Sequence, residues 1–244
     1  MPEAVLGDHD PSATGPHVEV IDDRGRPALA IDGAVQSVAV GEGAAPSGYW
    51  PAMLPDQAPR EALLLGLGGG TIVHLLVGAF GPLPIVGVDD DSGVVELART
   101  HFGLDLPNLQ IVVGDAFAYV AGAAGRFDFV CVDLYRDGAI PAEVCASRFL
   151  AHVRRLLRPG GTATFNLARD RRAGDRLRQL DRHFVVTRRI RVGFNLVVHC
   201  ALEPPTALDN ADHPTARPGH RRGRQLRRGR GRARRSYDAA GDEP

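Results

Sequence analysis

The sequence predicts an α/β fold in which helices cover a mostly parallel sheet. We expect an antiparallel pair of strands at its C-terminal end and a small β-hairpin unit before it. Three observations predict this fold. Apolar runs typical of buried strands alternate with helical patterns from residue 62 onward, the first run leads into a glycine-rich turn, and acidic residues follow successive runs.

The residue pattern of the N-terminal part of the chain predicts β-strands. We expect residues 1–16 to form a flexible leader and residues 17–58 to form the hairpin unit with its connecting loop. Val18 and Val20 alternate with polar neighbours. Asp32-Gly33 is typical of a tight hairpin turn, because glycine adopts a positive φ without a Cβ clash.

Residues 59–204 are expected to form the α/β domain. Apolar runs predict strands at residues 62–65, 84–88, 109–113, 127–132 and 163–166. Helices are expected at residues 71–80, 92–102 and 142–157, the second of them capped by Asp91. Two consecutive strands at residues 183–190 and 192–200, joined by a short turn, are expected to be antiparallel.

Composition excludes several classes of protein. The 244 residues are 44% hydrophobic and 24% charged, which is unlike collagen, coiled coils or a wholly disordered chain. No apolar run reaches the ~20 residues of a membrane span. The cysteines Cys131, Cys145 and Cys200 form no CxxC pair and indicate neither a disulfide framework nor a zinc site. We therefore expect a cytoplasmic protein without a metal or a membrane partner.

The C-terminal segment, residues 205–244, differs from the rest. It contains 10 arginines between Arg217 and Arg235, and such a segment cannot bury a core, so we expect it to be disordered. Three interpretations stay open. It binds nucleic acid or another anionic surface, it is a solvated tail without a fixed role, or it is the product of a shifted reading frame in GC-rich DNA.

The glycine-rich turn at residues 66–70 is typical of a nucleotide site. Gly66, Gly68 and Gly70 allow the backbone to approach a ligand, and the helix that follows presents free N–H groups. The fingerprint of nicotinamide dinucleotide sites would need glycine where this chain has Thr71. A tight turn without a ligand is the alternative.

Acidic residues stand at the ends of three successive predicted strands. Asp89 lies 23 residues after Gly66 and suits the two hydroxyls of a ribose. Asp115 suits the exocyclic amine of an adenine, and Asp133 reaches the same edge of the sheet. Each acid alone could cap a helix. Three acids above one glycine turn indicate a nucleoside site.

These motifs resemble those of class I S-adenosylmethionine-dependent methyltransferase-fold enzymes, which are Rossmann-like. Within that superfamily the chain most resembles the spermidine synthase (polyamine aminopropyltransferase) family, over roughly residues 17–200. Residues 29–37 resemble the family's N-terminal hairpin motif with its Asp-Gly and Gln. Tyr49 stands where the family has a Tyr before a His-Glu pair, and residues 94–104 resemble the helix after the ribose-binding acid.

The resemblance implies a role for each matching residue. Asp133 would be catalytic at the start of the catalytic loop. The substrate would be bound by Tyr49, Tyr135 and Asp137. The donor would be bound by Gln36, Gly66, Gly68, Gly70, Asp89, Asp115 and Ala116.

The implied reaction moves an aminopropyl group from decarboxylated S-adenosylmethionine to a small-molecule amine such as putrescine. The co-substrate is then decarboxylated S-adenosylmethionine, or intact S-adenosylmethionine, and no metal is needed. A homodimer is an open alternative to a monomer. Nucleic acid is expected as a partner only if the Arg-rich tail is functional.

The chain departs from the family at three places. Gly69 replaces an Asp that would bind the donor's amine, and Arg136 replaces the second acid of the catalytic loop, with Asp137 one residue further. Trp50-Pro51 replaces the His-Glu pair. An arginine beside the acceptor would repel a diamine. A methyltransferase and a non-catalytic nucleoside-binding relative therefore stay open as alternatives.

Overall fold

A computed structural model describes residues 5–9, 17–41, 47–136 and 138–202. The chain divides into two units, Met1–Pro205 and Thr206–Pro244, and the described residues all belong to the first. Asp137 and the segment 205–244 lie outside the described residues. So does most of the predicted leader, although Val5–His9 within it form a strand. That strand pairs with the otherwise open edge of the next one.

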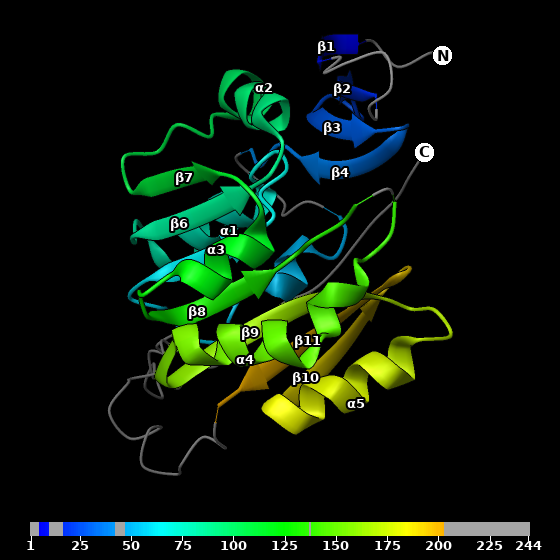
Figure 1. The fold of residues 1–244 in the computed structure, drawn as a ribbon. Helices are drawn as coiled ribbons and strands as arrows, with labels where there is room; N and C mark the ends of the chain where they lie inside the picture. Colours follow the sequence, from blue (N-terminus) through cyan, green and yellow to red (C-terminus); the bar gives the residue numbers. More distant parts are fainter. Residues whose placement is uncertain (1–4, 10–16, 42–46, 137, 203–244) are drawn as a thin grey trace, which may run out of the picture. The chain divides into compact units, whose positions relative to one another are not determined.

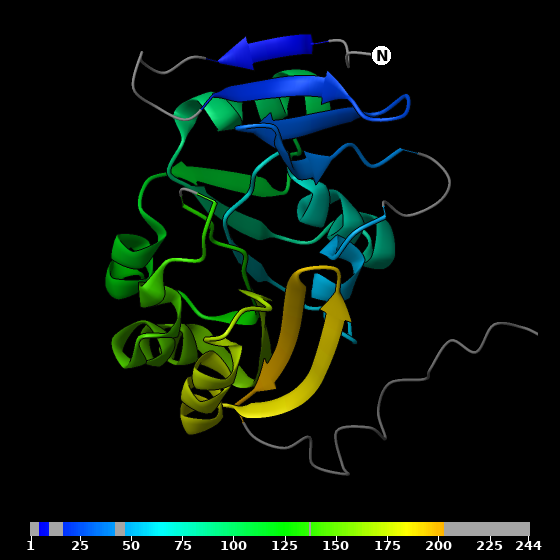
Figure 2. The ribbon, with the colours of Figure 1, turned by 90° about the vertical axis from the view of Figure 1, so that its right-hand side faces the viewer.

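The larger sheet has seven strands in the order β10-β11-β9-β8-β5-β6-β7 (Figures 1 and 2). Its strands are β5 (Ala62–Leu65), β6 (Ile85–Asp89), β7 (Leu109–Val113), β8 (Phe127–Val132), β9 (Leu157–Ala168), β10 (Val185–Val192) and β11 (Asn195–Ala201). Strands β5 to β9 pair in parallel, and β11 and β10 pair antiparallel at one end. The predicted parallel sheet with an antiparallel C-terminal pair is confirmed.

Helices cover both faces of this sheet. One face carries α3 (Ala116–Gly122), α4 (Ser147–Leu156) and α5 (Ala173–His183), whose apolar side chains share one core cluster with the sheet. The other face carries α1 (Thr71–Phe80) and the 3-10 turn η1 (Trp50–Met53). The fully buried strand β5 lies between these two clusters, which explains its continuous apolar sequence.

A smaller sheet of four antiparallel strands lies beside the glycine turn. It consists of β1 (Val5–His9), β2 (Val18–Asp22), β3 (Pro27–Ile31) and β4 (Ala34–Val38). Valines and leucines of β2 and β3 pack against α2 (Ser92–Phe102). The hydroxyl of Thr71 accepts from the backbone N–H of Val38 at 2.9 Å and donates to its carbonyl at 2.8 Å. Thr71 therefore ties the small sheet to the start of α1.

Local chemistry explains where α2 begins and ends. The carboxylate of Asp91 accepts from the backbone N–H groups of Gly93 and Val94, as expected of an N-cap. Gly103 ends the helix with a φ of 66°.

Three helices differ from the sequence-based expectation. The helix expected at residues 142–157 is interrupted, because Ala146 is extended (ψ 137°). A 3-10 turn η2 (Ala142–Cys145) therefore precedes α4. The other two, α3 and α5, were not predicted at all. In α5, Ala173, Leu177 and Leu180 have the spacing of an amphipathic helix and pack on the core, a signal that the sequence analysis did not use.

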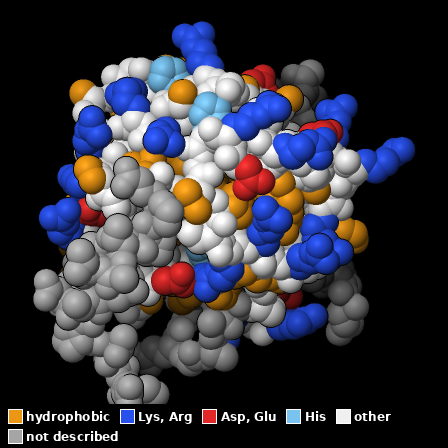
Figure 3. All heavy atoms as spheres, turned by 90° about the horizontal axis from the view of Figure 1, so that it is seen from below, with side chains coloured by type: hydrophobic (Ala, Val, Ile, Leu, Met, Phe, Trp, Pro, Cys, Tyr) orange, Lys and Arg blue, Asp and Glu red, His pale blue; other side chains and the backbone are white. Residues whose placement is uncertain are grey.

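Charge is unevenly distributed along the chain. Residues 17–146 hold 17 Asp and Glu against 6 Arg, whereas residues 147–202 hold 13 Arg against 3 Asp. The second group forms α4, α5 and the β9–β11 end of the sheet. Figure 3 shows the molecule from the side on which α5 and β10 lie in Figure 1, and arginine side chains are spread over much of it. Within the described residues, no helix is long and apolar enough to cross a membrane.

Candidate active site

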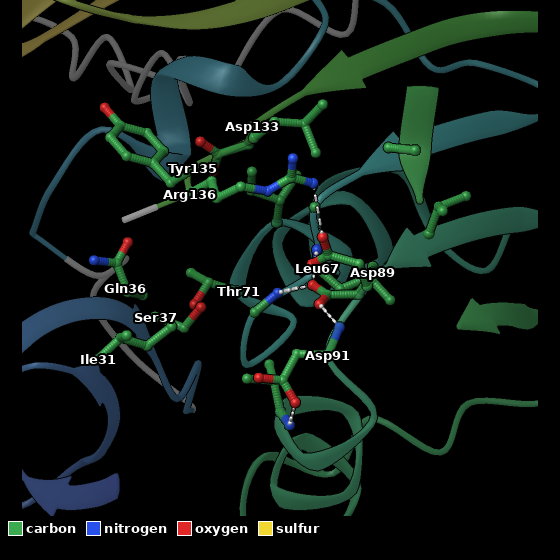
Figure 4. Close-up of a pocket in the computed structure, with 18 of the residues that line it drawn as sticks. Ile31, Gln36, Ser37, Leu67, Thr71, Asp89, Asp91, Asp133, Tyr135 and Arg136 are labelled. Carbon is green, nitrogen blue, oxygen red and sulfur yellow. Dashed lines mark hydrogen bonds and ion pairs between the residues drawn. The ribbon is translucent and has the colours of Figure 1, made fainter. Parts of the chain in front are cut away.

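A cavity of about 490 Å³ lies where the strands β5, β6 and β8 end and the small sheet approaches them (Figure 4). Most of the site residues expected from the sequence line it. They are Gln36, Tyr49, Gly66, Gly68, Asp89, Ala116, Asp133 and Tyr135. Gly70 and Asp115 are not part of the lining, and Asp137 lies outside the described residues.

Backbone crowding explains the glycines of the turn. Gly66 has a φ of 87°, and a Cβ there would lie 2.1 Å from the carbonyl oxygen of Asp133. Gly70 (φ 81°) precedes α1, and its own Cβ would meet the side chain of Leu104 at 2.3 Å. Gly70 therefore faces Leu104 and not the cavity, and its role is to allow the turn before α1. At Gly69, a Cβ would lie 2.9 Å from Cβ of Ser37.

Crowding by neighbouring side chains explains why position 69 is a glycine. Its N–H donates to the Ser37 hydroxyl at 2.8 Å, and the ring of Phe102 closes its other side. An aspartate at this position would collide with both neighbours. The Ser37 side chain of the small sheet and the Phe102 ring of α2 thus fill the space beside Gly69.

Asp89 is held by the backbone of the glycine turn. Its Oδ2 accepts from the N–H groups of Leu67 and Gly68 at 2.8 and 3.0 Å, and its Oδ1 accepts from Asp91 N at 3.2 Å (Figure 4). Burial raises the pKa of Asp89, and these three N–H groups oppose the rise. The carboxylate therefore organises the turn and also faces the cavity.

Asp115 lies at the rim, with 45% of its side chain exposed. One oxygen accepts from Ala118 N at 2.8 Å and caps α3, whereas the other lies 3.5 Å from Nη2 of Arg136. The neighbouring Ala116 and Phe117 line the cavity. The expected contact between Asp115 and an adenine amine stays a prediction.

Arg136 does not stand as a free cation beside the reaction centre. Its Nη2 lies 3.1 Å from Oδ2 of Asp90, which follows β6, and 3.5 Å from Oδ2 of Asp115. Hydrogen bonding to Asp90 raises the pKa of Arg136. The repulsion of a diamine expected from this arginine is thus offset by two carboxylates that the sequence did not place beside it.

Asp133 follows the end of β8 in a partly buried position that faces the cavity. Its Oδ2 accepts from the Tyr49 hydroxyl and its Oδ1 from Nδ2 of Asn166, both at 2.8 Å. Burial raises the pKa of Asp133, while the two hydrogen bonds oppose that rise. Burial and the neighbouring Asp133 together raise the pKa of Tyr49 well above its ordinary value. The tyrosine therefore keeps its proton and is a hydrogen-bond donor to Asp133.

Asn166 is a site residue that the sequence reasoning missed. It lies on β9 with only 1% of its surface exposed, and its Oδ1 has no hydrogen-bond partner among the described residues. The signal was present in the sequence, because an amide within a buried apolar strand needs a polar partner. What the sequence does not reveal is that this partner is Asp133.

Aromatic rings line the part of the cavity nearest Asp133. The Tyr49 and Trp50 rings lie 5.0 Å apart, and the hydroxyl of Tyr135 donates to Asn195 Oδ1 at 3.2 Å. Burial raises the pKa of Tyr135 to about 12, so its hydroxyl stays protonated. Besides Asp89 and Asp133, three carboxylates that sequence reasoning did not assign to the site line the cavity: Asp32, Asp90 and Asp91. Because Arg136 is the one arginine among the described residues of the lining, the cavity favours cations.

No cluster of His, Cys, Asp or Glu among the described residues has the arrangement of a metal site. The glycine turn, the acids beside it and the cavity volume fit a nucleoside better than an ion.

Comparisons with known proteins agree with this geometry. Residues 62–161 match the family described as a methyltransferase domain. The chain is 33% identical over 115 residues to a probable polyamine aminopropyl transferase of Bifidobacterium longum, covering 47% of this chain and 25% of that protein. It is 30% identical over 149 residues to polyamine aminopropyltransferase 2 of Hyperthermus butylicus, covering 55% and 47%. The chain thus spans less than half the length of these relatives.

Solved structures share the fold. A probable spermidine synthase from Corynebacterium glutamicum superposes with a TM-score of 0.68 at 18% identity, covering 81% of this chain and 80% of that one. Human methyltransferase-like protein 13, in complex with SAH, gives 0.56 at 26% identity, covering 64% and 77%. The chain therefore has the fold of these structures, and about half of it is similar in sequence to curated polyamine aminopropyltransferases.

Proposed function

We propose that this protein is a spermidine synthase-like transferase. It binds decarboxylated S-adenosylmethionine and transfers the aminopropyl group to a small-molecule amine such as putrescine. One observation carries the proposal. A partly buried carboxylate, Asp133, is held by Tyr49 and Asn166 beside a glycine turn and an acidic cavity.

The chemistry requires a neutral amine nitrogen. Its lone pair attacks the aminopropyl carbon next to the sulfonium, the carbon–sulfur bond breaks, and methylthioadenosine leaves with the electron pair. The attacking nitrogen then gives up one proton. Asp133 suits the role of acceptor for that proton, because burial raises its pKa toward the pH at which the protein would work.

The rest of the cavity supports binding of two cationic substrates. Asp89 presents a carboxylate at the glycine turn, where a ribose would lie. Asp32, Asp90 and Asp91 add negative potential around it. An acceptor with two amines and a sulfonium donor are both favoured in such a field.

A methyltransferase is the second candidate, and the match of residues 62–161 to a methyltransferase domain favours it. The two candidates differ in their donor, because intact S-adenosylmethionine carries a carboxylate that the decarboxylated form lacks. An acidic cavity opposes that additional negative charge. We therefore expect the decarboxylated donor to bind more tightly in calorimetric titration.

The deciding experiment measures release of methylthioadenosine. The protein is incubated with decarboxylated S-adenosylmethionine and a panel of amines, with Asp133→Asn as the matched control. Release with at least one amine and its loss in the variant would support the proposal. No release with any amine, together with clear nucleoside binding, would contradict it and favour a methyltransferase or a non-catalytic relative.

We extend the proposal to the protein's setting. Its three cysteines are buried and free, which supports the reducing cytoplasm as its location. Cell fractionation tests this. A homodimer is proposed on the family resemblance alone, and sedimentation velocity at micromolar concentration distinguishes it from a monomer.

A further inference from the structure

The arginines of residues 147–202 exceed what the fold itself uses. Five of the thirteen form ion pairs with acids, namely Arg158, Arg176, Arg178, Arg188 and Arg189. The other eight have no acidic partner among the described residues, and all eight are exposed. They are Arg148, Arg154, Arg155, Arg169, Arg171, Arg172, Arg182 and Arg191.

Some of these eight have a structural role. Arg154 donates to the carbonyl of His183, and Arg155 donates to the carbonyls of Val120 and Ala123 at the end of α3. No such hydrogen bond to the described residues is made by the guanidinium groups of Arg171, Arg172 and Arg191. These three exposed guanidinium groups therefore remain available to an anion from solution.

An exposed aromatic side chain accompanies these charges. Phe194, at the tip of the β10–β11 hairpin, has 90% of its surface exposed. The tip is held from behind, because Arg169 donates its backbone N–H to the carbonyl of Phe194 at 2.8 Å and its guanidinium to the carbonyl of Gly193 at 2.7 Å. Figure 2 shows this hairpin along the outer side of the sheet. The ring is thus presented to solvent on a fixed support.

We call this surface the basic strip. It consists of Arg169, Arg171, Arg172, Arg182, Arg191 and Phe194, on α5, β10 and their flanking turns. None of these residues lines the cavity that contains Asp133. Arg172 and Arg182 lie at the two ends of α5, ten residues and therefore ~15 Å apart along the helix. The strip is therefore long enough for several phosphates of an extended chain.

Two simpler explanations account for only part of the strip. Arginines on an exposed edge strand prevent pairing with other chains, but Arg171, Arg172 and Arg182 are not on β10. A membrane surface would need a contiguous apolar patch. The exposed large hydrophobic residues at this end of the sheet are Val185 and Phe194, which lie at opposite ends of the hairpin arm formed by β10.

We propose that the basic strip binds single-stranded nucleic acid, with arginines on the phosphates and Phe194 stacked on a base. Arginine-lined grooves that carry an exposed aromatic ring are typical of proteins that bind single strands, since every base offers a face for stacking. This binding is separate from the proposed aminopropyl transfer and does not depend on it.

Fluorescence anisotropy of the full chain with a labelled ~12-nucleotide RNA, over a series of salt concentrations, tests the proposal. The Phe194→Ala variant should bind about fivefold or more weakly with an unchanged salt slope. The double variant Arg172→Gln/Arg191→Gln should bind about tenfold more weakly, and its slope in log Kd against log salt should fall by ~1.4.

The matched control is the double variant Arg24→Gln/Arg99→Gln. It removes the same charge from two exposed arginines in the acidic part of the chain and should leave affinity and slope unchanged. Thermal melting of all variants checks that they fold.

Several results would overturn the proposal. They are an absence of binding at low salt, equal losses in the test and control doubles, or wild-type affinity in both Phe194→Ala and the test double. Tighter binding to phosphatidylserine vesicles than to RNA would assign the strip to a membrane surface instead.

Discussion

Asp89 and Asp133 end two strands of the same sheet, yet their surroundings differ in kind. Asp89 is held by three backbone N–H groups, so its position follows from the path of the glycine turn. Asp133 is held by two side chains, Tyr49 and Asn166, which come from distant parts of the chain. The backbone donors fix the position of Asp89, which suits a residue that binds a ligand. The side-chain donors tune the pKa of Asp133, which suits a carboxylate that takes part in a reaction.

The largest expected effect comes from Asp133→Asn. The variant keeps the size of the side chain and loses the proton acceptor, so turnover should fall by ~10²–10⁴. Binding of 5′-methylthioadenosine, measured by calorimetry, should change little. A variant that also loses nucleoside binding would contradict the assignment of nucleoside binding to Asp89 and proton transfer to Asp133.

Asp89→Ala tests the proposed role of Asp89 in nucleoside binding. The loss of a buried, charge-assisted acceptor should weaken binding of 5′-methylthioadenosine by about tenfold or more. Asp115→Ala should have a smaller effect, because that side chain is 45% exposed and does not line the cavity. Unchanged affinity in both variants would remove the nucleoside assignment.

Asn166→Ala tests whether its side-chain hydrogen bond lowers the pKa of Asp133. It removes one of the hydrogen bonds that lower the pKa of Asp133, so that pKa should rise further above its ordinary value. The acid limb of the kcat/KM profile should therefore move to higher pH, with kcat reduced roughly three- to tenfold. Thr164→Ala is the matched control. It is on the same strand but donates to the carbonyl of Met53, and it should lower Tm without moving the profile.

The smallest effect concerns stability. Burial raises the pKa of Asp133 in the folded state, so the folded protein binds more protons than the unfolded chain between the ordinary pKa of Asp and the raised one. This group's contribution to stability is therefore fully present at low pH and is lost as pH rises through that window. Thermal melts from pH 4 to 8 should fall less steeply for Asp133→Asn than for the wild type. Parallel curves would mean that Asp133 titrates as an ordinary aspartate.

Sequence patterns were sufficient to predict those elements whose formation depends on a short stretch of the chain. The parallel strands were predictable from continuous apolar runs, the Asp91 cap from one residue before a helix, and the glycine turn from its own letters. The three acids were predictable as a group because parallel strands end at one edge of a sheet. Helix α5 was missed although its apolar positions Ala173, Leu177 and Leu180 follow helical spacing, so its cause was local too.

Only the tertiary structure decided which groups meet. Tyr49, Asp133 and Asn166 are separated by 84 and 33 positions in the chain, and their contact depends on strand order and register. The same holds for Arg136, whose ion pairs with Asp90 and Asp115 do not follow from its own charge. It holds too for Gly69, because the space beside it is taken by Ser37 and Phe102. Hydrophobic patterning determines that strands form, whereas the chemistry of a buried group depends on neighbours that the sequence order does not reveal.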